Sequence, residues 1–302
     1  MDPLSDIVAL LRPHDCMAAG LDASGEWAIR YERHAGMKCN AVVKGGCWLS
    51  VDDGPATWLD AGTCFILPHG RPFLISSAEQ RREASAETIY APIPHGGTVV
   101  HGEGGEFYMI GSRFLLSGAA AKVLLSPLPP VIVVGPGPDS AVVAWTLDQI
   151  AAELRTPRPG SALSIAHLSH VLLLQAMRQH LTSSDVARGT WLAALSDPRI
   201  ARAVAALHDD PGHAWTVEGL AGKAGMSRTT FAVRFRDATG RTPMAYLTDW
   251  RMLLAAKRLA STNDPVAKIA AEVGYASESA FTVAFRRAKG RTPRQYARGG
   301  AG

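Results

Sequence analysis

Four cysteines are the residues best able to do covalent chemistry in this sequence: Cys16, Cys39, Cys47 and Cys64. None follows the CxxC spacing of a zinc site or a dithiol motif. A thiol reacts with an oxidant or an electrophile where it is ionised and accessible. Cys16 follows two polar residues, outside any strand pattern. One hypothesis is therefore an exposed thiolate at Cys16 that senses an oxidant, with Cys39 or another thiol as its resolving partner.

Cys47 and Cys64 alternate with apolar residues along two short segments, which predicts that both thiols line the interior of a β domain. Buried cysteines are usually inert small hydrophobic residues. The competing hypothesis for sensing is therefore an apolar or aromatic small molecule bound inside that domain, against Trp48 or Trp58. The sequence leaves both hypotheses open.

Metal-ligand chemistry has little support in the sequence. His167 and His170 lie three residues apart in a helical pattern, but no carboxylate and no third ligand accompany them. We expect no metal site and no other cofactor.

The C-terminal third contains an internal duplication. The Gly-Arg-Thr-Pro motif at 240–243 recurs at 290–293, and Phe231 and Phe235 recur as Phe281 and Phe285, each 50 positions later. Upstream the offset falls to 49, because Gly225 matches Gly274. One residue is therefore inserted after this glycine, in a turn, where insertion is tolerated. A repeat of this length indicates a duplicated supersecondary unit.

Each copy is predicted to form a helix, a tight turn and a second helix. In the first copy the helices cover 217–224 and, after a cap at Ser227, reach 238. In the second copy they cover 266–273 and, after a cap at Ser277, reach 289. A helix-turn-helix of this kind places its second helix in the major groove of DNA. The helical pattern at 244–260 predicts a linker that holds both second helices about 34 Å apart, one turn of DNA.

The side chains that would meet DNA follow from helical geometry. With the phenylalanines on the buried face, a rotation of about 100° per residue puts another set on the opposite face or at its flanks. The predicted DNA-binding residues are Arg228, Thr229, Thr230, Ala232, Val233 and Arg236 in the first copy and Ser279, Thr282, Val283 and Arg286 in the second. The apolar members suit thymine methyl groups, and the arginines suit guanine or phosphate.

Length and charge agree with two domains of different kinds. At roughly 150 residues per domain, 302 residues make two domains. Residues 1–191 hold 14 basic and 18 acidic residues, whereas 192–302 hold 17 and 9, a net charge of +8. A basic half favours a polyanionic partner. The sequence has no apolar stretch long enough to span a membrane, and its acidic N-terminus does not fit a secretion signal, so we expect a cytoplasmic location.

The N-terminal half has the pattern of an antiparallel β domain. A helix is predicted at 4–11, and short β-rich runs follow at 27–31, 41–43, 47–51, 57–59, 64–67, 88–91, 98–101 and 106–110. Turn residues separate these runs, as in a sandwich or barrel. Two helices are predicted next, before and after a breaking segment at 156–160, and they are candidates for an interdomain or dimer element.

Several motifs of the C-terminal part, among them Ala224-Gly225-Met226-Ser227-Arg228, Trp250-Arg251-Met252 and Val273-Gly274-Tyr275, resemble those of the AraC family of bacterial transcription regulators. In the N-terminal part, Gly46-Cys47-Trp48-Leu49 and Asp60-Ala61-Gly62 are similar to the cupin-like effector domain of one branch of that family. The resemblance implies a sensor domain that controls a duplicated helix-turn-helix, usually in a homodimer. It also implies contact with RNA polymerase, and activation more often than repression.

The expected fold is therefore an α+β two-domain protein. Residues 1–135 form a cupin-like regulatory domain, an antiparallel β-barrel of the jelly-roll type, and 136–190 form a helical dimerisation or linker region. Residues 195–299 form an all-α DNA-binding domain with two helix-turn-helix motifs joined by a linker helix. The expected partners are a double-stranded DNA operator, a second copy of the chain and an effector of unknown identity.

An enzyme is the alternative hypothesis, in the form of a metal-dependent cupin oxygenase fused to a DNA-binding tail. Metal-binding cupins bring several histidines and a carboxylate into the barrel. In this branch of the family, histidines often stand near the positions that Asn40 and Phe73 occupy here. This departure from the pattern argues against a metal site and against cupin enzymology.

Overall fold

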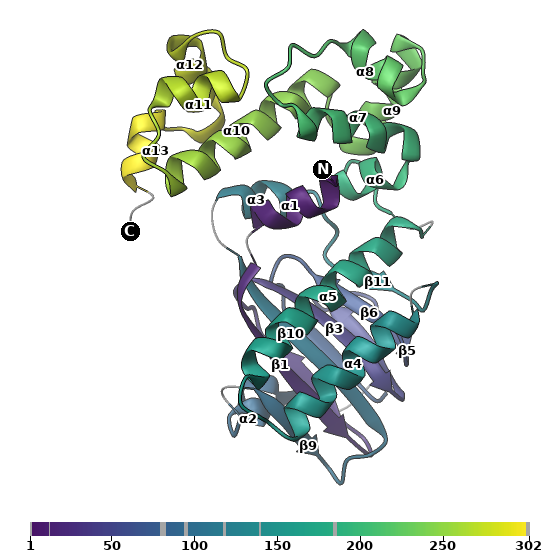
Figure 1. The fold of residues 1–302 in the computed structure, drawn as a ribbon. Helices are drawn as coiled ribbons and strands as arrows, with labels where there is room; N and C mark the ends of the chain where they lie inside the picture. The colour runs from purple at the N-terminus through teal and green to yellow at the C-terminus, as the bar shows by residue number, and fades with distance from the viewer. Residues whose placement is uncertain are drawn as a thin grey trace. The chain divides into compact units, whose positions relative to one another are not determined.

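The computed structural model describes residues 2–11, 13–78, 83–93, 96–116, 119–138, 140–183 and 186–299. The chain divides into two compact units (Figure 1). The β unit combines Pro13–Leu116 with Leu128–Asp185, and the helical unit combines Met1–Arg12, Ser117–Pro127 and Val186–Gly302. Two segments from the N-terminal half thus belong to the helical unit. The domain boundaries expected from the sequence, at residues 135 and 190, did not include this arrangement.

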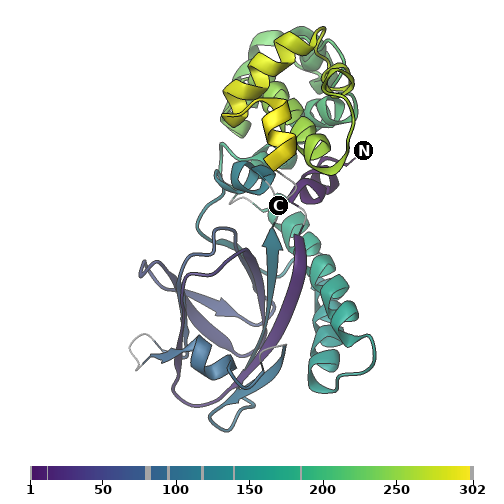
Figure 2. The same cartoon turned by 90° about the vertical axis from the view of Figure 1, so that its left-hand side faces the viewer.

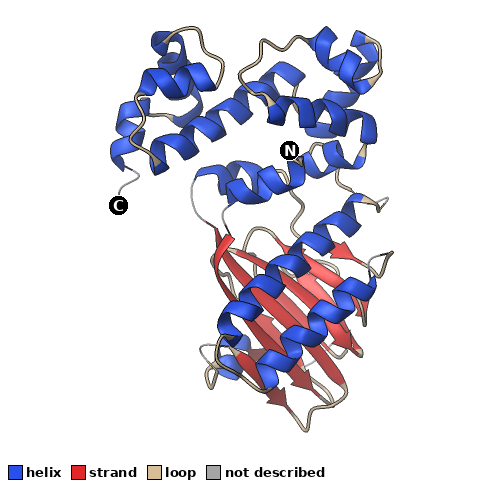
Figure 3. Cartoon of the chain, viewed as in Figure 1, coloured by secondary structure: helices blue, strands red, loops and turns tan. Residues whose placement is uncertain are grey.

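The β unit contains two sheets (Figure 3). The six-stranded sheet has the order β11-β6-β3-β10-β1-β9, and the five-stranded sheet has the order β5-β4-β7-β2-β8. The strands of the first sheet are β1 (Pro13–Ala23), β3 (Met37–Lys44), β6 (Cys64–Leu67), β9 (Gly97–His101), β10 (Phe107–Leu116) and β11 (Ile132–Val134). Those of the second are β2 (Ala28–Tyr31), β4 (Gly46–Val51), β5 (Thr57–Asp60), β7 (Phe73–Ser76) and β8 (Ala84–Ser85).

Most neighbouring strands in the β unit are antiparallel, while the pairs β1–β9 and β2–β8 are parallel. Alternate residues of both sheets form one apolar core, which includes Ile29, Val42, Phe65, Phe73 and Met109. The prediction of a jelly-roll β domain is confirmed. It takes the form of two separate sheets rather than one closed barrel.

Helices α4 (Ser140–Arg155) and α5 (Ser161–Leu181) cover the outer face of the six-stranded sheet (Figures 1 and 2). The break between them falls at the predicted segment, and Gly160 adopts a φ of +89°, a left-handed conformation that glycine reaches without steric cost. On the sheet side the helices bury Leu147, Leu154 and Leu172. Within the described residues, no helix is both long and apolar enough to cross a membrane.

Two predictions for the β unit were wrong. Residues 88–91 were expected to be a strand, but helix α2 (Ala86–Tyr90) occupies this segment. Ile89 and Tyr90 pack against the core between the sheets, and this tertiary contact outweighs their intrinsic strand preference. The long strand β1 was not predicted, because its apolar alternation begins only after the polar stretch at its start.

The helical unit begins with α1 (Pro3–Leu11) and α3 (Ala119–Leu125), and it continues with α6 (Trp191–Ser196) and α7 (Pro198–Asp209). The indole nitrogen of Trp191 donates a hydrogen bond of 2.8 Å to the carbonyl of Leu124. The duplicated segment supplies the remaining helices: α8 (Val217–Ala224), α9 (Arg228–Thr239), α10 (Pro243–Ser261), α11 (Val266–Glu272), α12 (Glu278–Lys289) and α13 (Pro293–Gly299).

The two copies of the duplication pack in the same way. Phe231 and Phe235 are fully buried in one core cluster, and Phe281 and Phe285 are fully buried in another. The ring of Phe235 meets Tyr246 at 5.6 Å and 84°, and the ring of Phe285 meets Tyr296 at 5.4 Å and 83°. The repeated phenylalanines and tyrosines therefore build the same edge-to-face cluster twice.

Candidate nucleic-acid interface

Helices α8 and α9 form the first helix-turn-helix. The side chain of Thr216 accepts the N–H of Gly219 and begins α8, and Gly225 ends it with a φ of +63°. Ser227 accepts the N–H of Thr230 at 3.2 Å and begins α9. One residue therefore separates the terminating glycine from the capping serine.

Helices α11 and α12 repeat this arrangement with one residue more. Gly274 follows α11 with a φ of +80°, and the side chain of Ser277 begins α12 by accepting the N–H of Ala280. Tyr275 and Ala276 occupy the turn where the first copy has only Met226. The single inserted residue predicted from the change of offset lies in this turn.

Of the ten residues predicted to meet DNA, eight are exposed. Ala232 and Thr282 are half-buried. The two valines stand out, because Val233 is 55% exposed and Val283 is 71% exposed, whereas the phenylalanines two residues away are fully buried. Such exposed apolar side chains on the outer faces of α9 and α12 suit thymine methyl groups.

Two of the predicted hydroxyl groups are engaged at the helix caps. The hydroxyl of Ser227 donates to that of Thr230 at 2.9 Å, and the hydroxyls of Ser277 and Ser279 lie 3.0 Å apart. These side chains stabilise the starts of α9 and α12. Thr229, in contrast, is exposed without such a bond among the described residues, so its hydroxyl is free to reach a base edge.

The arginines on these helices are exposed and have no carboxylate partner among the described residues. This holds for Arg228, Arg234, Arg236, Arg286 and Arg287. Arg241 and Arg294, by comparison, form ion pairs with Asp249 and Glu278 at 3.5 and 3.4 Å. Unpaired, exposed guanidinium groups are available to bind phosphate or guanine.

Arg291 is a cation that the sequence-based assignment missed. It is exposed and lines an open hollow together with Arg286, Thr292 and Gln295. The Gly-Arg-Thr-Pro repeat contains Arg291, so its recurrence was the signal that could have placed this residue among the candidates.

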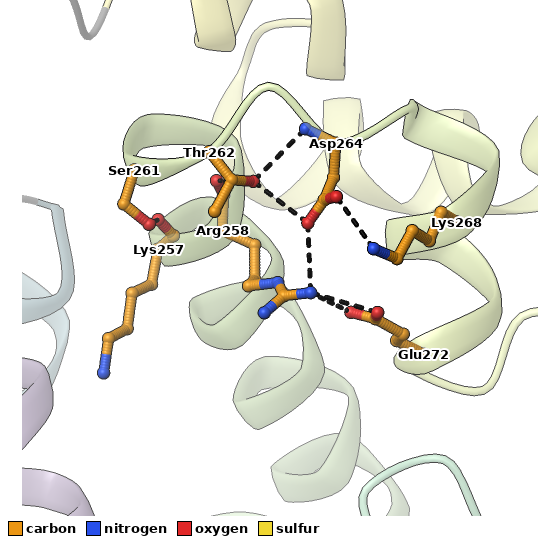
Figure 4. Close-up of polar contacts among 7 residues, drawn as sticks. All are labelled: Lys257, Arg258, Ser261, Thr262, Asp264, Lys268 and Glu272. Atoms are coloured by element: carbon orange, nitrogen blue, oxygen red, sulfur yellow. Dashed lines mark hydrogen bonds and ion pairs between the residues drawn. The ribbon is translucent and has the colours of Figure 1, made fainter.

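An ion-pair network ties the end of linker helix α10 to α11 (Figure 4). One terminal nitrogen of Arg258 lies 3.0 Å from Asp264 Oδ2 and 2.9 Å from Glu272 Oε2, and Lys268 Nζ lies 2.9 Å from Asp264 Oδ1. Lys268 and Arg258 hold the pKa of the Asp264 carboxyl below its usual value. The network therefore fixes the orientation of α11, the first helix of the second helix-turn-helix, relative to linker helix α10.

The structure contradicts the hypothesis that Cys16 is an exposed thiolate outside the strands. Cys16 lies within β1, at an irregularity in its pairing with β10, and it is half-buried. Burial raises the pKa of its thiol to about 11, although a hydrogen bond to Ser169 acts in the opposite direction. The thiol of Cys16 is therefore protonated at neutral pH.

The other three thiols are buried. Cys47 belongs to the core between the sheets, as predicted, whereas Cys64 does not, because Phe65 and Leu67 are the β6 residues in that core. Burial raises the pKa of Cys47 and of Cys64 to about 12 each, and it raises that of Cys39 well above its ordinary value. The charges of Cys64 and Cys16 also raise the pKa of Cys39.

Trp48 does not line the interior of the β unit. It alternates with the core residues Cys47 and Leu49, and its ring meets that of Trp58 at 5.4 Å and 69°. Trp58 is 43% exposed, so both rings lie on the outer face of the five-stranded sheet. The expectation of a ligand held against either tryptophan inside the domain was wrong.

Metal-ligating side chains do not gather in the described ranges, where no group of three or more His, Cys, Asp or Glu residues could hold an ion. Asn40 is buried on β3 and Phe73 is buried in the core. His170 donates a hydrogen bond of 2.6 Å from Nδ1 to the carbonyl of Ala166.

Comparison with known proteins gives both halves of the chain a match. Residues 2–182 match a family described as cupin, and residues 220–299 match a family described as a helix-turn-helix domain. The chain is 39% identical, over 93% of both chains, to a Streptomyces antibioticus protein named "Putative AraC-like transcription regulator". It is 36% identical to the RCS-specific HTH-type transcriptional activator RclR of Escherichia coli K12, over 93% of this chain and 91% of that one.

Among solved structures, the DNA-binding domain of AdpA in complex with a target DNA is 35% identical to this chain. It covers 33% of this chain and 89% of its own length, with a TM-score of 0.32.

Proposed function

This chain belongs to the AraC-like family of transcription regulators, and from that premise we propose that it reads a DNA operator with α9 and α12 in successive major-groove segments. The chain is an AraC-type DNA-binding regulator, and its relatives and domain matches identify a regulator rather than an enzyme. The proposal adds which side chains make the contacts and how regulation is exerted.

The exposed faces of α9 and α12 support this proposal. Each helix presents an exposed valine and arginines without carboxylate partners among the described residues, while its phenylalanines hold it in a core. Val233, Val283 and Thr229 would read base edges, and Arg228, Arg234 and Arg287 would bind phosphate. Arg236 and Arg286 are placed to reach either.

The β unit is the proposed sensor. Two signals were expected, thiol oxidation and a bound molecule, and the raised pKa values of all four thiols favour the bound molecule. Oxidation at Cys16 is the alternative, and it is supported by the name of the Escherichia coli relative, which is called "RCS-specific". Mass spectrometry of the thiols after oxidant treatment separates the two signals: Cys16 left unmodified under conditions that change transcription excludes the redox signal.

We propose a homodimer formed through α4 and α5. These helices expose large apolar side chains away from the sheet they cover: Val142, Trp145, Leu163 and Val171, with Trp145 57% and Leu163 64% exposed. Val142 and Trp145 lie three residues apart and share one face of α4. Several large exposed apolar side chains on one pair of helices are typical of a protein interface.

Regulation is proposed to take the form of activation, in the cytoplasm, through contact with RNA polymerase. The name of the Escherichia coli relative, an activator, supports this sign. The first experiment is selection of bound fragments from genomic DNA with the purified full-length protein at a stated salt concentration. Enrichment of one site supports the proposal, and recovery of fragments without sequence preference, with and without oxidant, contradicts it.

A further inference from the structure

A pocket of about 460 Å³ opens between the two sheets of the β unit. Residues of β1, β3 and β10 form one wall, Tyr31 of β2 forms another, and α2 with the residues after it closes a third side. This volume is within the range of small-molecule binding sites. The pocket is distinct from the surface of α9 and α12.

Two of the basic residues that line this pocket, Lys38 and Arg113, have no anionic partner in the described part of the chain. The side chains of Lys38 on β3 and Arg113 on β10 form no ion pair or hydrogen bond with any residue in the described ranges, and their Cα atoms are paired across the sheet. Arg33 also lines the pocket, but it is exposed. The Lys38 ammonium instead lies over the rings of Tyr31 and Phe73, at 4.6 and 5.0 Å. Burial, and then the charge of Arg113, lower the pKa of Lys38 to about 8. An unpaired, partly buried pair of cations is costly unless an anion joins it.

Two buried polar atoms of the pocket also have no partner in the described part of the chain. They are Nδ2 of Asn40 and Nε2 of His34. Asn40 is only 2% exposed, and it pairs across the sheet with Gly111, where a side chain would press on its amide. Because buried polar groups are almost always hydrogen-bonded, an amide donor left free in a pocket indicates a ligand atom that it would bind.

The acidic residues at this pocket do not neutralise its cations. Glu32 and Glu87 line the rim and are exposed, and neither forms an ion pair with Lys38 or Arg113 among the described residues. Tyr90, Ile93 and Met109 supply an aromatic and aliphatic part of the lining. A ligand that fits must therefore carry a negative group at one end and an apolar body at the other.

We propose that this pocket binds an organic carboxylate, with the carboxylate on Lys38 and Arg113, the amide of Asn40 as a further donor, and the apolar body against Tyr90 and Met109. The inference rests on the proposed function, because it gives the chemical class of the effector that the β unit senses. Inorganic phosphate alone would satisfy the cations and leave the apolar wall without a partner.

The test is a set of thermal melts of the full-length protein with benzoate, phenylacetate and hexanoate, each beside its uncharged amide, at up to about 10 mM. We expect at least one carboxylate to raise the melting temperature of the β unit by about 3 °C, while its amide gives no comparable shift. Equal shifts with acid and amide, a shift with inorganic phosphate but none with the organic acids, or no shift with any acid would each overturn the proposal.

Two variants connect that response to the pocket. Lys38→Met and Arg113→Gln should each weaken carboxylate binding at least tenfold, whereas Lys44→Gln, on the exposed end of the same strand, should leave it unchanged. Lys38→Met removes an unpaired buried charge, so it should not lower the melting temperature of the ligand-free protein. A Lys38→Met protein that keeps full carboxylate binding would contradict the assignment, and Arg113→Gln provides the same test if the first variant folds poorly.

The thermal melts test carboxylate binding independently of DNA binding. The melts contain no DNA, and operator binding by Lys38→Met is measured separately. If carboxylate binding fails while the operator is still selected, the ligand assignment falls and the proposed function stands. If the protein binds carboxylate but selects no operator, the ligand assignment stands and the proposed function falls.

Discussion

Asp6 on α1 and His208 on α7 face each other inside the helical unit, with 3.5 Å between Oδ2 and Nδ1. The imidazole stacks on Trp250 at 3.6 Å, and its Nε2 lies 3.0 Å from the hydroxyl of Tyr246. The distance suits an ion pair, but burial lowers the pKa of His208 to about 3 and raises that of Asp6. A neutral imidazole therefore lies between α1 and the core of the first helix-turn-helix.

The neutral state of His208 predicts acid sensitivity of the helical unit. The unfolded chain takes up the imidazole proton near the ordinary pKa of 6.5, while the native protein does so only near 3. Stability is therefore complete above about pH 6.5 and is lost as the pH falls toward 3. Between about pH 6 and 4, we expect a loss of about 1 kcal/mol per pH unit, measured by urea unfolding of the full-length protein.

The raised pKa of Asp6 has the opposite sign, since the native state binds that proton more tightly. We would therefore compare Asp6→Asn with Asp6→Asn/His208→Gln, and use His213→Gln, which changes an exposed histidine, as the control. A pH dependence that survives His208→Gln unchanged would show that another group is responsible.

The two classes of DNA contact predict different mutant behaviour. Val283→Ala or Thr229→Ala should change the preference at one base pair by about threefold to tenfold, because these side chains face base edges. Arg228→Ala should weaken all sites similarly and reduce the slope of log K against log salt by about 1, as a phosphate contact does. Binding to a randomised operator library at several salt concentrations measures both. Equal losses on specific and scrambled DNA for all three variants would refute the groove assignment.

The Arg258 network is expected to matter for the second helix-turn-helix alone. Arg258→Ala should reduce affinity for a complete operator by about fivefold, because α11 and α12 lose the ion pairs that fix their direction. Lys257→Ala is the matched control: this neighbouring lysine points away from the network (Figure 4). Fluorescence anisotropy with one-element and two-element DNA measures the effect, and similar losses for both variants would argue against a role for the network.

The dimer proposal predicts a mutation that separates the subunits. Trp145→Glu places a charge in the exposed apolar face of α4 and should shift the protein from dimer to monomer at micromolar concentration, as measured by analytical ultracentrifugation. Trp58→Glu changes another exposed tryptophan, on the five-stranded sheet, and should leave the dimer intact. Dissociation by Trp58→Glu, or none by Trp145→Glu, would place the interface elsewhere.

Sequence reasoning was most successful where local signals repeat. The caps at Ser227 and Ser277, the glycines at 225 and 274 and the phenylalanine spacing determined both helix-turn-helix units almost to the residue. These features act over one or two helical turns, so a single sequence contains all the information. The outer faces of α9 and α12 followed directly from the buried phenylalanines.

Long-range contacts could not be predicted from such local signals. No local pattern encodes how distant segments pack. This packing places Asp6 opposite His208 and pairs Lys38 with Arg113 across the sheet. The faces of short strands were equally hard to assign: Cys64 and Trp48 each alternate with apolar neighbours, and one step of register decides which side is the core.

We propose that one chain places two helices in successive major-groove segments. The most direct measurement is affinity for the selected operator with 5 or 10 extra base pairs inserted between its two half-elements. We predict that an insertion of 5, half a turn of DNA, reduces affinity to that of a single half-element, because α10 fixes the separation of α9 and α12. Undiminished binding to the DNA with the 5-base-pair insertion would contradict the fixed spacing of α9 and α12.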